Sequence, residues 1–533
     1  MGRPPITDYR LLITDYRLLI TDYRLPITDY RLPITDYRSP ITDHRFRISH
    51  YSHFLLELRA VLWRHYLMNK SALDSGISRR RFLAATALAV AAPTFISANA
   101  LGRAGRASPS ERIAVGVVGW GMQGPGNTNE LLGITDAQVV AACDLDKKHL
   151  QQALDKINGH YKNQDCKPYD DYRQMMARED IDAVMIAVPD NWHALVAIEA
   201  AKNKKDIYGE KPLARTIAEQ QAIVKAVQKN KRIWQTGSWQ RSQRPFRQAC
   251  EIVRNGLIGK ITRVEVGLPA GHHDFARTAP ALLAKFPNAP KDTEYLAQVV
   301  PGSADWNIAV TPPPPELDYE RWLGPARQEP YIQARVFMNW RWNYNVGGGQ
   351  LLDWIGHHCD IAHWGMGMDT DGPSEIEGHG EFPPKDAIWN TCGKYRIELK
   401  YPKDITMIIA GGHNDIRGGT KWIGTDGWVW VDRGGYDASN VDWFVKIPED
   451  RYKVKLYETK SHMRNFIECV KSRQPTITPV EVGHHSAIPG HLGLISMLVG
   501  RKIRWDAAKE VILGDAEASK LLTRPYRSPW KLA

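Results

Sequence analysis

The segment that most clearly carries chemistry is a glycine-rich run near residue 120. It reads Gly119-Trp120-Gly121-Met122-Gln123-Gly124. In a turn between a strand and a helix, the first glycine permits a sharp bend, the second lets the backbone approach a pyrophosphate, and the third allows helix and strand to pack closely. Free N–H groups at the start of the helix can bind phosphate oxygens. The run therefore indicates a dinucleotide site.

An acidic residue follows at the distance that such a site needs. Asp144 comes 25 residues after Gly119, directly behind an apolar stretch. A carboxylate at this place accepts hydrogen bonds from the hydroxyls of the adenosine ribose and repels a 2′-phosphate, so we expect NAD rather than NADP. A helix N-cap is the alternative role for Asp144, and Lys147 and Lys148 lie nearby.

The elements around these residues alternate between strand and helix. Apolar, β-branched runs predict parallel strands over residues 112–118, 137–143, 183–188 and 206–208. The expected helices cover residues 127–132, 147–158 and 194–203. This rhythm predicts an α/β fold that begins with a doubly wound Rossmann sheet, and such sheets bind ligands at the carboxyl ends of their strands.

Further motifs stand where those strands end and beyond. They are Val188-Pro189-Asp190-Asn191-Trp192-His193, Gly209-Glu210-Lys211-Pro212, Trp322-Leu323-Gly324-Pro325, and Asp353 followed by His357-His358. Together with the glycine run they resemble the glucose-fructose oxidoreductase/inositol dehydrogenase (Gfo/Idh/MocA) family over residues 111–533. Glu-Lys-Pro combined with Asp-x-x-x-His is the specific part of this resemblance.

The resemblance implies which residues serve the chemistry. The catalytic residues would be Lys211, Asp353 and His357, with His357 as general base, Lys211 stabilising the alkoxide, and Asp353 orienting the imidazole from one helical turn away. NAD would contact the glycine run from Gly119 to Gly124, Asp144, Pro189, Glu210 and Lys211.

Other interpretations of these residues stay open. Asp353 and His357 could form an exposed helix pair, and His358 could be the base instead. The histidines at 272–273, 357–358, 363 and 484–485 could ligate a metal, but no spacing typical of zinc sites supports this, and we expect none.

Substrate contacts are expected from aromatic and polar residues, because indole faces suit the C–H faces of sugars and polar groups suit their hydroxyls. The candidates are His193, Trp239, Arg241, Arg341 and His358. The proline-rich residues 311–315 are interpreted as a stiff surface loop.

The chain after the Rossmann domain is less regular. We divide it into an NAD-binding domain at 111–236 and a C-terminal substrate and oligomerisation domain at 237–533. Strands are expected over residues 261–267, 394–401, 405–411 and 428–431. The resemblance implies an α+β domain with an open, mainly antiparallel sheet that supports homo-oligomers.

The first 110 residues are expected to lie outside the enzyme. Residues 1–67 repeat the pattern Ile-Thr-Asp-Tyr-Arg every seven residues with recurrent prolines, which oppose a coiled coil and favour a disordered extension or a wrongly chosen start upstream of Met68. Residues 68–110 carry Arg79-Arg80 before an apolar stretch and a small-residue site ending at Ala100. This predicts a twin-arginine signal, the export machinery as partner, and a periplasmic product without a stable membrane span.

Charge and cysteine content exclude other classes. The formal net charge is +11, but residues 1–67 carry +3 and residues 68–110 carry +5, so the body is nearly neutral and no nucleic-acid groove is expected. The six cysteines form no CxxC pair, and we expect buried thiols.

The predicted function is NAD-dependent hydride transfer to or from a secondary alcohol of a sugar, polyol or glycoside. Because free NAD is scarce outside the cytoplasm, we expect the cofactor to be held tightly. The alternatives are a glycoside hydrolase that works by NAD-assisted oxidation and elimination, and a non-catalytic sugar-binding protein on the same fold.

Overall fold

The computed structural model describes residues 111–271, 310–383, 387–447 and 452–532. The repeat, the twin-arginine segment and the histidines at 272–273 lie outside these ranges. The structure therefore does not test the predictions made for them. Within the described ranges, no helix has both the length and the apolar character needed to cross a membrane.

The first half of the described chain forms a parallel sheet of six strands in the order β3-β2-β1-β4-β5-β6. The strands are β1 (Ile113–Val118), β2 (Ala137–Cys143), β3 (Lys167–Tyr169), β4 (Ala183–Ile186), β5 (Asp206–Gly209) and β6 (Trp234–Thr236). Strand order reverses between β1 and β4, as in a doubly wound fold. The expected Rossmann sheet is confirmed.

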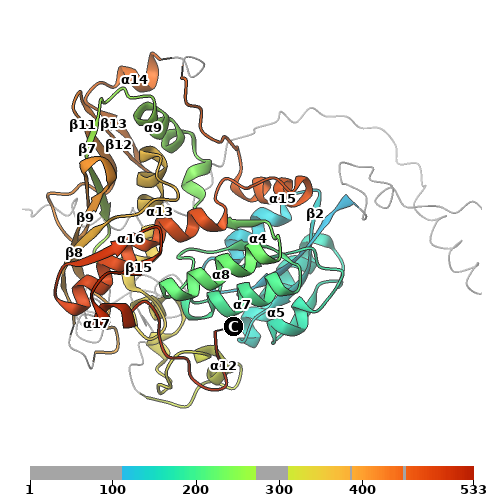
Figure 1. Cartoon of the computed structure of the whole chain (residues 1–533). Helices are drawn as coiled ribbons and strands as arrows, with labels where there is room; N and C mark the ends of the chain where they lie inside the picture. Colours follow the sequence, from blue (N-terminus) through green and yellow to red (C-terminus); the bar gives the residue numbers. More distant parts are fainter. Residues whose placement is uncertain (1–110, 272–309, 384–386, 448–451, 533) are drawn as a thin grey trace, which may run out of the picture. The chain divides into compact units, whose positions relative to one another are not determined.

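Helices cover both faces of this sheet. They are α4 (Gly124–Leu132), α5 (Lys147–Tyr161), α6 (Tyr172–Met176), α7 (His193–Lys202) and α8 (Ile217–Lys229). One buried cluster joins α7 and α8 to one face, and another joins α4 and α5 to the other face. The second cluster also contains α15 (His462–Ser472), which comes from much later in the chain and lies beside α4 in Figure 1. The later half of the chain therefore completes the Rossmann core.

The second half contains a nine-stranded sheet in the order β13-β12-β11-β7-β10-β9-β8-β14-β15. The strands are β7 (Ile261–Leu268), β8 (Glu375–Glu381), β9 (Lys394–Tyr401), β10 (Ile405–Gly411), β11 (Gly419–Gly424), β12 (Trp428–Asp432), β13 (Gly435–Ala438), β14 (Ile503–Asp506) and β15 (Val511–Ile512). Only the β7–β10 pair of this sheet is parallel, so the expected mainly antiparallel sheet is confirmed.

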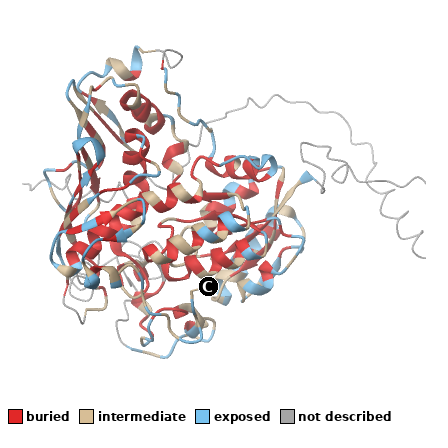
Figure 2. Ribbon diagram, in the orientation of Figure 1, coloured by how far each residue is buried: buried red, intermediate tan, exposed pale blue. Residues whose placement is uncertain are grey.

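Long helices pack on one face of this second sheet. They are α9 (Arg244–Arg254), α13 (Gly349–Met366) and α16 (Val480–Val499). Figure 2 shows α13 and α16 buried along most of their length. Short helices complete the chain: η3 (Asp190–Trp192), η4 (Trp239–Ser242), α12 (Tyr319–Leu323), η5 (Gln333–Arg335), η6 (Phe337–Trp342), η7 (Pro402–Asp404), α14 (Asp442–Val445) and α17 (Ala516–Lys520).

Sequence patterns located the apolar strands of this sheet but not all of its members. Strands β7, β9, β10 and β12 coincide with the expected ones, whereas β8, β11, β13, β14 and β15 were not expected. Glycines and charges interrupt the sequences of β8 and β11, for example at Gly378 and Gly380. Pairing with neighbouring strands overrides such weak local preference.

Candidate active site

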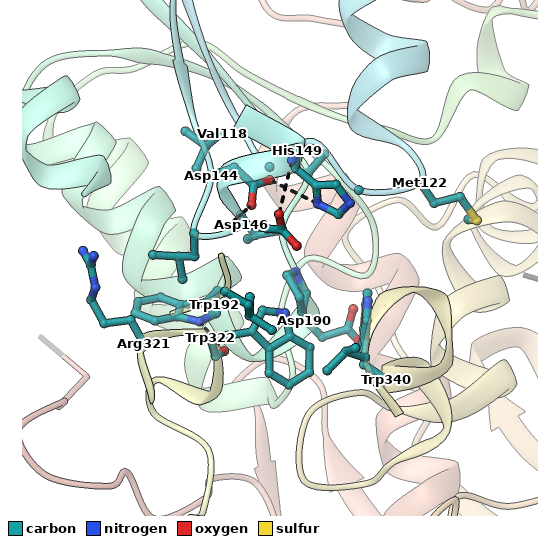
Figure 3. Close-up of a pocket in the computed structure, with 18 of the residues that line it drawn as sticks. Val118, Met122, Asp144, Asp146, His149, Asp190, Trp192, Arg321, Trp322 and Trp340 are labelled. Atoms are coloured by element: carbon teal, nitrogen blue, oxygen red, sulfur yellow. Dashed lines mark hydrogen bonds and ion pairs between the residues drawn. The ribbon is translucent and has the colours of Figure 1, made fainter. Parts of the chain in front are cut away.

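A cavity of about 730 Å³ runs along the carboxyl ends of the Rossmann strands (Figure 3). One wall consists of the turns that follow β1, β2, β4 and β5. The opposite wall comes from residues 311–341, which belong to the second half of the chain, and from Trp530 near its end. The cavity therefore lies where a doubly wound sheet is expected to bind its ligand.

The glycine run lines one end of this cavity, and each glycine has a distinct reason for its place. Gly119 has φ +91°, and a Cβ added there would stand 2.4 Å from the carbonyl oxygen of Ala187. A Cβ on Gly124 would stand 2.1 Å from the carbonyl oxygen of Gly119. A Cβ on Gly121 meets no described atom within 4 Å, because it points into open space.

Most of the run faces the cavity, and the rest supports it. Gly119, Gly121, Met122 and Gln123 are lining residues, whereas Trp120 is buried and Gly124 is the first residue of α4. The open space beside Gly121 and the start of α4 at Gly124 form a cradle, in which backbone N–H groups can face a pyrophosphate.

Asp144 lies at the same end, immediately after β2. Its Oδ2 accepts a hydrogen bond from the Trp120 N–H at 2.6 Å, and its Oδ1 accepts one from the Asp146 N–H at 2.8 Å. Burial raises the pKa of the Asp144 carboxyl, while His149 and the two backbone donors oppose this effect. Asp146, not Asp144, is the N-cap of α5, so Asp144 remains available to the ribose of a dinucleotide.

The other end of the cavity holds an ion pair that crosses between the two halves of the chain. Lys211 Nζ donates to Asp353 Oδ1 at 3.0 Å and to the Asp353 carbonyl oxygen at 2.9 Å. Arg341 Nε lies 3.3 Å from the same Oδ1. Burial alone would raise the pKa of Asp353, but the two cations lower it below its ordinary value.

His357 lies on the same helix as Asp353, in an aromatic surrounding. The centroid of its ring is 5.4 Å from that of Trp354 and 6.4 Å from that of Trp239, both edge to face. Burial holds the pKa of His357 well below its ordinary value, and Arg433, Lys211 and His358 lower it further. An imidazole in this state is neutral at physiological pH and can accept a proton.

The structure differs from the expectation that Asp353 orients His357. No hydrogen bond joins them among the described residues; instead, Lys211 and Arg341 both donate to Oδ1 of Asp353. His357 Nδ1 has no hydrogen-bond partner in the described chain, and His357 does not line the cavity as Lys211 and Asp353 do.

His193, Pro189 and Glu210 line the cavity, and two of them support the turn that carries Lys211. The ring nitrogens of His193 are 2.8 Å from the carbonyl oxygen of Pro212 and 2.9 Å from that of Val188. Glu210 accepts a hydrogen bond from Asn127 at 2.8 Å, and burial raises the pKa of its carboxyl. His193 therefore braces the site, since its nitrogens are already engaged.

Arg341 is the expected substrate residue that lies in the cavity with free hydrogen-bonding capacity beyond its bonds to Asp353 and Met338. Arg241 is not in the cavity, because it is buried between Asp360 and Asp369 at 2.8 and 2.7 Å.

The two remaining substrate candidates, Trp239 and His358, do not line the cavity either. Trp239 contacts Arg433, whose guanidinium carbon is 4.7 Å from its ring centroid. His358 Nε2 is 3.3 Å from Asp432.

The structure adds a wall that sequence patterns did not reveal. Residues 311–323, here called the strap, cross over the adenosine end of the groove, and Thr311, Pro312 and Pro314 line the cavity. The expected surface loop at 311–315 is confirmed, since Pro312, Pro313 and Pro315 are exposed, and the structure adds that part of this loop also faces the site.

Backbone hydrogen bonds fix the strap to the turn after Asp144. The Lys147 N–H donates to the Glu316 carbonyl at 3.0 Å, and the Asp318 N–H donates to the Leu145 carbonyl at 3.2 Å. Arg321 adds bonds to the Asp170 carbonyl at 2.9 Å and to its carboxylate at 3.1 Å. The strap and the glycine turn thus line the same end of the cavity.

Helix η6 supplies another part of this wall, next to Tyr331, Gln333, Ala334 and Val336. Met338, Asn339, Trp340 and Arg341 line the cavity, and only Arg341 was expected. Asn339 Nδ2 donates to the Ala334 carbonyl, while its Oδ1 is buried without a partner among the described residues. No periodic pattern marks this segment, so sequence reasoning had no signal for it.

Metal ligands are not assembled within the described ranges, where no three His, Cys, Asp or Glu side chains come together in a metal-binding arrangement. All six cysteines lie in those ranges as buried free thiols, which confirms the expectation for them.

Family comparisons match both halves of the chain. Residues 113–238 match the NAD-binding Rossmann-fold model of an oxidoreductase family, and residues 299–532 match its C-terminal alpha/beta domain model.

Individual relatives agree with these matches. A myo-inositol 2-dehydrogenase of Thermotoga maritima is 31% identical over 409 residues, covering 74% of this chain and 98% of that protein. An inositol 2-dehydrogenase of Salmonella typhimurium is 34% identical over 170 residues, covering 32% of this chain. The chain spans about half the length of this second relative, 48%.

Among solved structures, an aldose-aldose oxidoreductase of Caulobacter crescentus has the same fold. Its TM-score is 0.50 at 15% sequence identity, and the match covers 74% of this chain and 99% of that chain.

Proposed function

This chain belongs to the Gfo/Idh/MocA family of NAD-binding oxidoreductases, and on that premise we propose that it transfers hydride to or from a secondary alcohol of a sugar, polyol or glycoside. The observation that carries the proposal is one continuous cavity. Its first end is the glycine cradle with Asp144, and its second end is the Lys211–Asp353 pair. A dinucleotide bound at the first end would have its reactive ring directed toward the second.

The residues of the second end have separate tasks. When bound, NAD supplies the hydride acceptor or donor. The Lys211 ammonium donates to the substrate oxygen and stabilises the negative charge that develops there. Asp353 fixes Lys211 through two hydrogen bonds, and Arg341 offers further donors to substrate hydroxyls. The proposal assigns the hydroxyl proton to His357, whose neutral, buried imidazole lies one helical turn from Asp353 and outside the cavity wall, so that binding of substrate must bring the two within hydrogen-bond reach.

Turnover with a substrate panel tests this proposal. Purified protein is assayed with NAD and a set of inositols, aldoses and glycosides, following the absorbance of reduced nicotinamide. Lys211→Met is expected to lower kcat/KM on the order of 10²-fold, whereas Lys229→Met, an exposed lysine on α8, leaves it unchanged. Full activity in the Lys211 variant contradicts the proposal.

An elimination mechanism shares the cofactor site and the base, so turnover of glycosides needs a second measurement. Oxidation followed by elimination releases free sugar without net formation of NADH. Net NADH that matches substrate consumption supports the dehydrogenase and opposes the hydrolase.

We further propose that NAD stays bound between turnovers. The strap, which bonds to the backbone on both sides of Asp146, supports this. Nicotinamide absorbance that remains with the protein through gel filtration is the expected result. Its loss, together with weak binding of added NAD, contradicts tight retention.

Export and assembly complete the proposal. The Arg79-Arg80 motif supports twin-arginine export to the periplasm, and replacing both arginines by lysine is expected to leave the protein in the cytoplasmic fraction. The nine-stranded sheet, which has the helices α9, α13 and α16 packed on one face, supports a homo-oligomer that light scattering can measure.

A further inference from the structure

Helix α16 joins the two halves of the chain through buried polar side chains. It contacts both α13, which carries Asp353, and α8 of the Rossmann half. His484 and His491 on α16 meet Gln220 on α8, and all three are buried. Glu510, in the turn between β14 and β15, completes the group. Buried polar groups need hydrogen-bond partners, and the partners of a histidine determine which of its nitrogens carry protons.

These four side chains form one chain of hydrogen bonds, here called the histidine relay (Gln220, His484, His491 and Glu510). Gln220 Nε2 is 2.7 Å from His491 Nε2, and Gln220 Oε1 is 2.8 Å from His484 Nδ1. His484 Nε2 is 2.9 Å from Glu510 Oε1, and Oε2 of Glu510 accepts a bond from Gln221 at 2.8 Å. The relay thus connects the β14–β15 turn to α8 through α16.

The inner end of the relay lies at the segment that carries Lys211. Burial lowers the pKa of His491 to about 3, Arg215 and His484 lower it further, and a hydrogen bond to the Ala214 backbone opposes them. Since this bond favours the protonated ring, the ring donates and the Ala214 carbonyl accepts. His491 is therefore neutral, with its proton on the nitrogen that faces Ala214, three residues after Lys211.

The directions of the other hydrogen bonds follow from the neutral His491. Its Nε2 carries no proton and accepts from the Gln220 amide N–H, so the Gln220 oxygen faces His484. An amide oxygen only accepts, so His484 Nδ1 must donate. Burial alone would raise the pKa of Glu510, but its hydrogen bond with His484 and the charge of that ring lower it to about 2. The ionised carboxylate also only accepts, so both nitrogens of His484 donate and the ring is a cation.

Groups of both signs surround this ion pair. His485 Nε2 is 4.0 Å from Glu510 Oε1, and burial followed by the charge of His484 lowers the pKa of His485. Glu481, also on α16, accepts a hydrogen bond from Gln228 of α8 at 2.7 Å. The further charged groups that act on His485 and His491 are Asp371 and Arg215. Glu510 is thus the carboxylate that bonds directly to the His484 ring.

We propose that His484 is a positioning residue, whose buried imidazolium holds the Lys211 segment in place through Gln220, His491 and Ala214. The inference rests on the proposed function, because Lys211 is the group that is positioned. Lys211 is also confined from the side of α13, where a Cβ on Gly356 would stand 3.0 Å from the Lys211 Cβ. Since Lys211 must donate to the reacting oxygen, a shift of its backbone lowers the rate more than the affinity for NAD.

Two measurements on the full-length protein test the relay without turnover. Nitrogen-15 NMR with labelled histidine shows which ring nitrogens carry protons, and His484→Gln identifies the signal by its loss. Both nitrogens of His484 are expected to be protonated at pH 7, and a single protonated nitrogen overturns the cation. Hydrogen exchange of the peptide covering residues 209–218 is expected to be severalfold faster in His484→Gln. An unchanged exchange rate overturns the positioning role.

A double-mutant cycle connects the relay to Lys211. His484→Gln is expected to lower kcat about fivefold while the Kd for NAD stays within about twofold of the parent. In a Lys211→Met background the same change should cause no further loss, because the group through which it acts is absent. Equal losses in both backgrounds overturn the proposal.

Two other variants keep the result interpretable. His485→Gln, next on the same helix but outside the relay, is the matched control and should change neither the exchange rate nor kcat. Glu510→Gln tests the relay from a partly exposed residue, should His484→Gln fail to fold. Its amide can donate to a neutral ring, so His484 is expected to lose the proton on Nε2 and keep the one on Nδ1. A ring that stays doubly protonated there overturns the part assigned to the Glu510 charge.

Failure of the relay and failure of the proposed function give different results. A parent protein that turns over no member of the substrate panel with NAD overturns the function. The NMR and exchange measurements still decide whether the relay exists, because neither of them depends on turnover.

Discussion

Lys211, Asp353 and His357 are near one another, yet their connections differ from those that sequence spacing suggests. Asp353 accepts hydrogen bonds from Lys211 and Arg341, and His357 packs edge to face against Trp354 and Trp239. The imidazole is therefore controlled by burial and by nearby cations rather than by a carboxylate. Its protonation state at working pH follows from this surrounding.

Arg433 is the charged neighbour that most affects His357, so it offers a pH test. Removing this cation makes protonation of the imidazole easier and raises the pKa of His357 toward its ordinary value. In Arg433→Gln, the acid limb of kcat/KM is expected at a higher pH than in the parent. A titration of the His357 ring by NMR checks the same shift without turnover.

Arg396→Gln, which removes a cation on β9 paired with Asp415, serves as the control. This variant should leave both the pH profile of kcat/KM and the NMR titration of His357 unchanged. A uniform loss of activity in Arg433→Gln, without movement of the acid limb, would show a packing role only.

At the scale of elements, two alanine variants in the glycine turn distinguish an effect on folding stability from an effect on NAD binding. Gly119→Ala places a methyl group at φ +91° and 2.4 Å from the Ala187 carbonyl, so it is expected to lower stability by about 1–3 kcal/mol. Gly121→Ala meets no described atom within 4 Å and should leave the melting temperature unchanged. It should nevertheless weaken NAD binding at least about tenfold, because its methyl group occupies the pyrophosphate space. Calorimetry measures both the melting temperature and the affinity for NAD. An NAD affinity in Gly121→Ala equal to that of the parent would contradict the assignment of the glycine run as the pyrophosphate site.

The strap is the second element with a direct test. Arg321 joins it to the β3–α6 loop through Asp170, in addition to its bond with Asp318 at 2.6 Å. Arg321→Ala is expected to speed the release of NADH severalfold, since these bonds must break when the strap opens. Stopped-flow fluorescence measures the rate. Arg327→Ala, an exposed arginine just after the strap, should release NADH at the parent rate.

What could be predicted from sequence depended on how local each signal was. The turn at Gly119, the strands on either side of it and Asp144 follow from spacing within some thirty residues, and the structure places them as expected. The strap and Trp530 could not be found in this way. They contact the groove from segments without periodicity, and only the tertiary fold brings them there.

Side-chain pairing was the other feature beyond sequence reasoning. A spacing of four does put Asp353 and His357 on one helix, α13. Which partner a carboxylate selects depends on the groups that other elements present, here Lys211 from the turn after β5 and Arg341 from η6. The same limit explains Arg241, whose partners Asp360 and Asp369 are more than a hundred residues away.

At the scale of the whole molecule, buried histidines make stability depend on pH. Burial lowers the pKa of His363 to about 3, of His462 to about 4 and of His491 to about 3. In the unfolded chain each binds a proton near pH 6.5, while in the folded chain it does not. Below that pH the unfolded state holds more protons, and stability falls by about 1.4 kcal/mol per pH unit for each such group.

Urea unfolding between pH 7 and pH 5 measures this effect. Burial raises the pKa of Asp360 to about 6 and also raises the pKa of Asp144, Asp190 and Glu210, so these carboxyls oppose the effect. Burial lowers the pKa of His357 and His485 as well, so five histidines act against four carboxyls and we expect a lower free energy of unfolding at pH 5. His462→Asn should reduce the slope, and His379→Gln, an exposed histidine, should not. A free energy of unfolding at pH 5 that equals or exceeds the value at pH 7 contradicts the prediction.

The two sides of the cavity are far apart along the chain, and this has a consequence for how the protein matures. Gly119 and Trp530, which line the same space, are separated by 411 residues. A ribosome must therefore release nearly the entire polypeptide before the groove is complete. Capture of the nucleotide is then a late event in biogenesis, so a chain that stalls during synthesis would carry the phosphate turn but could not retain what binds there.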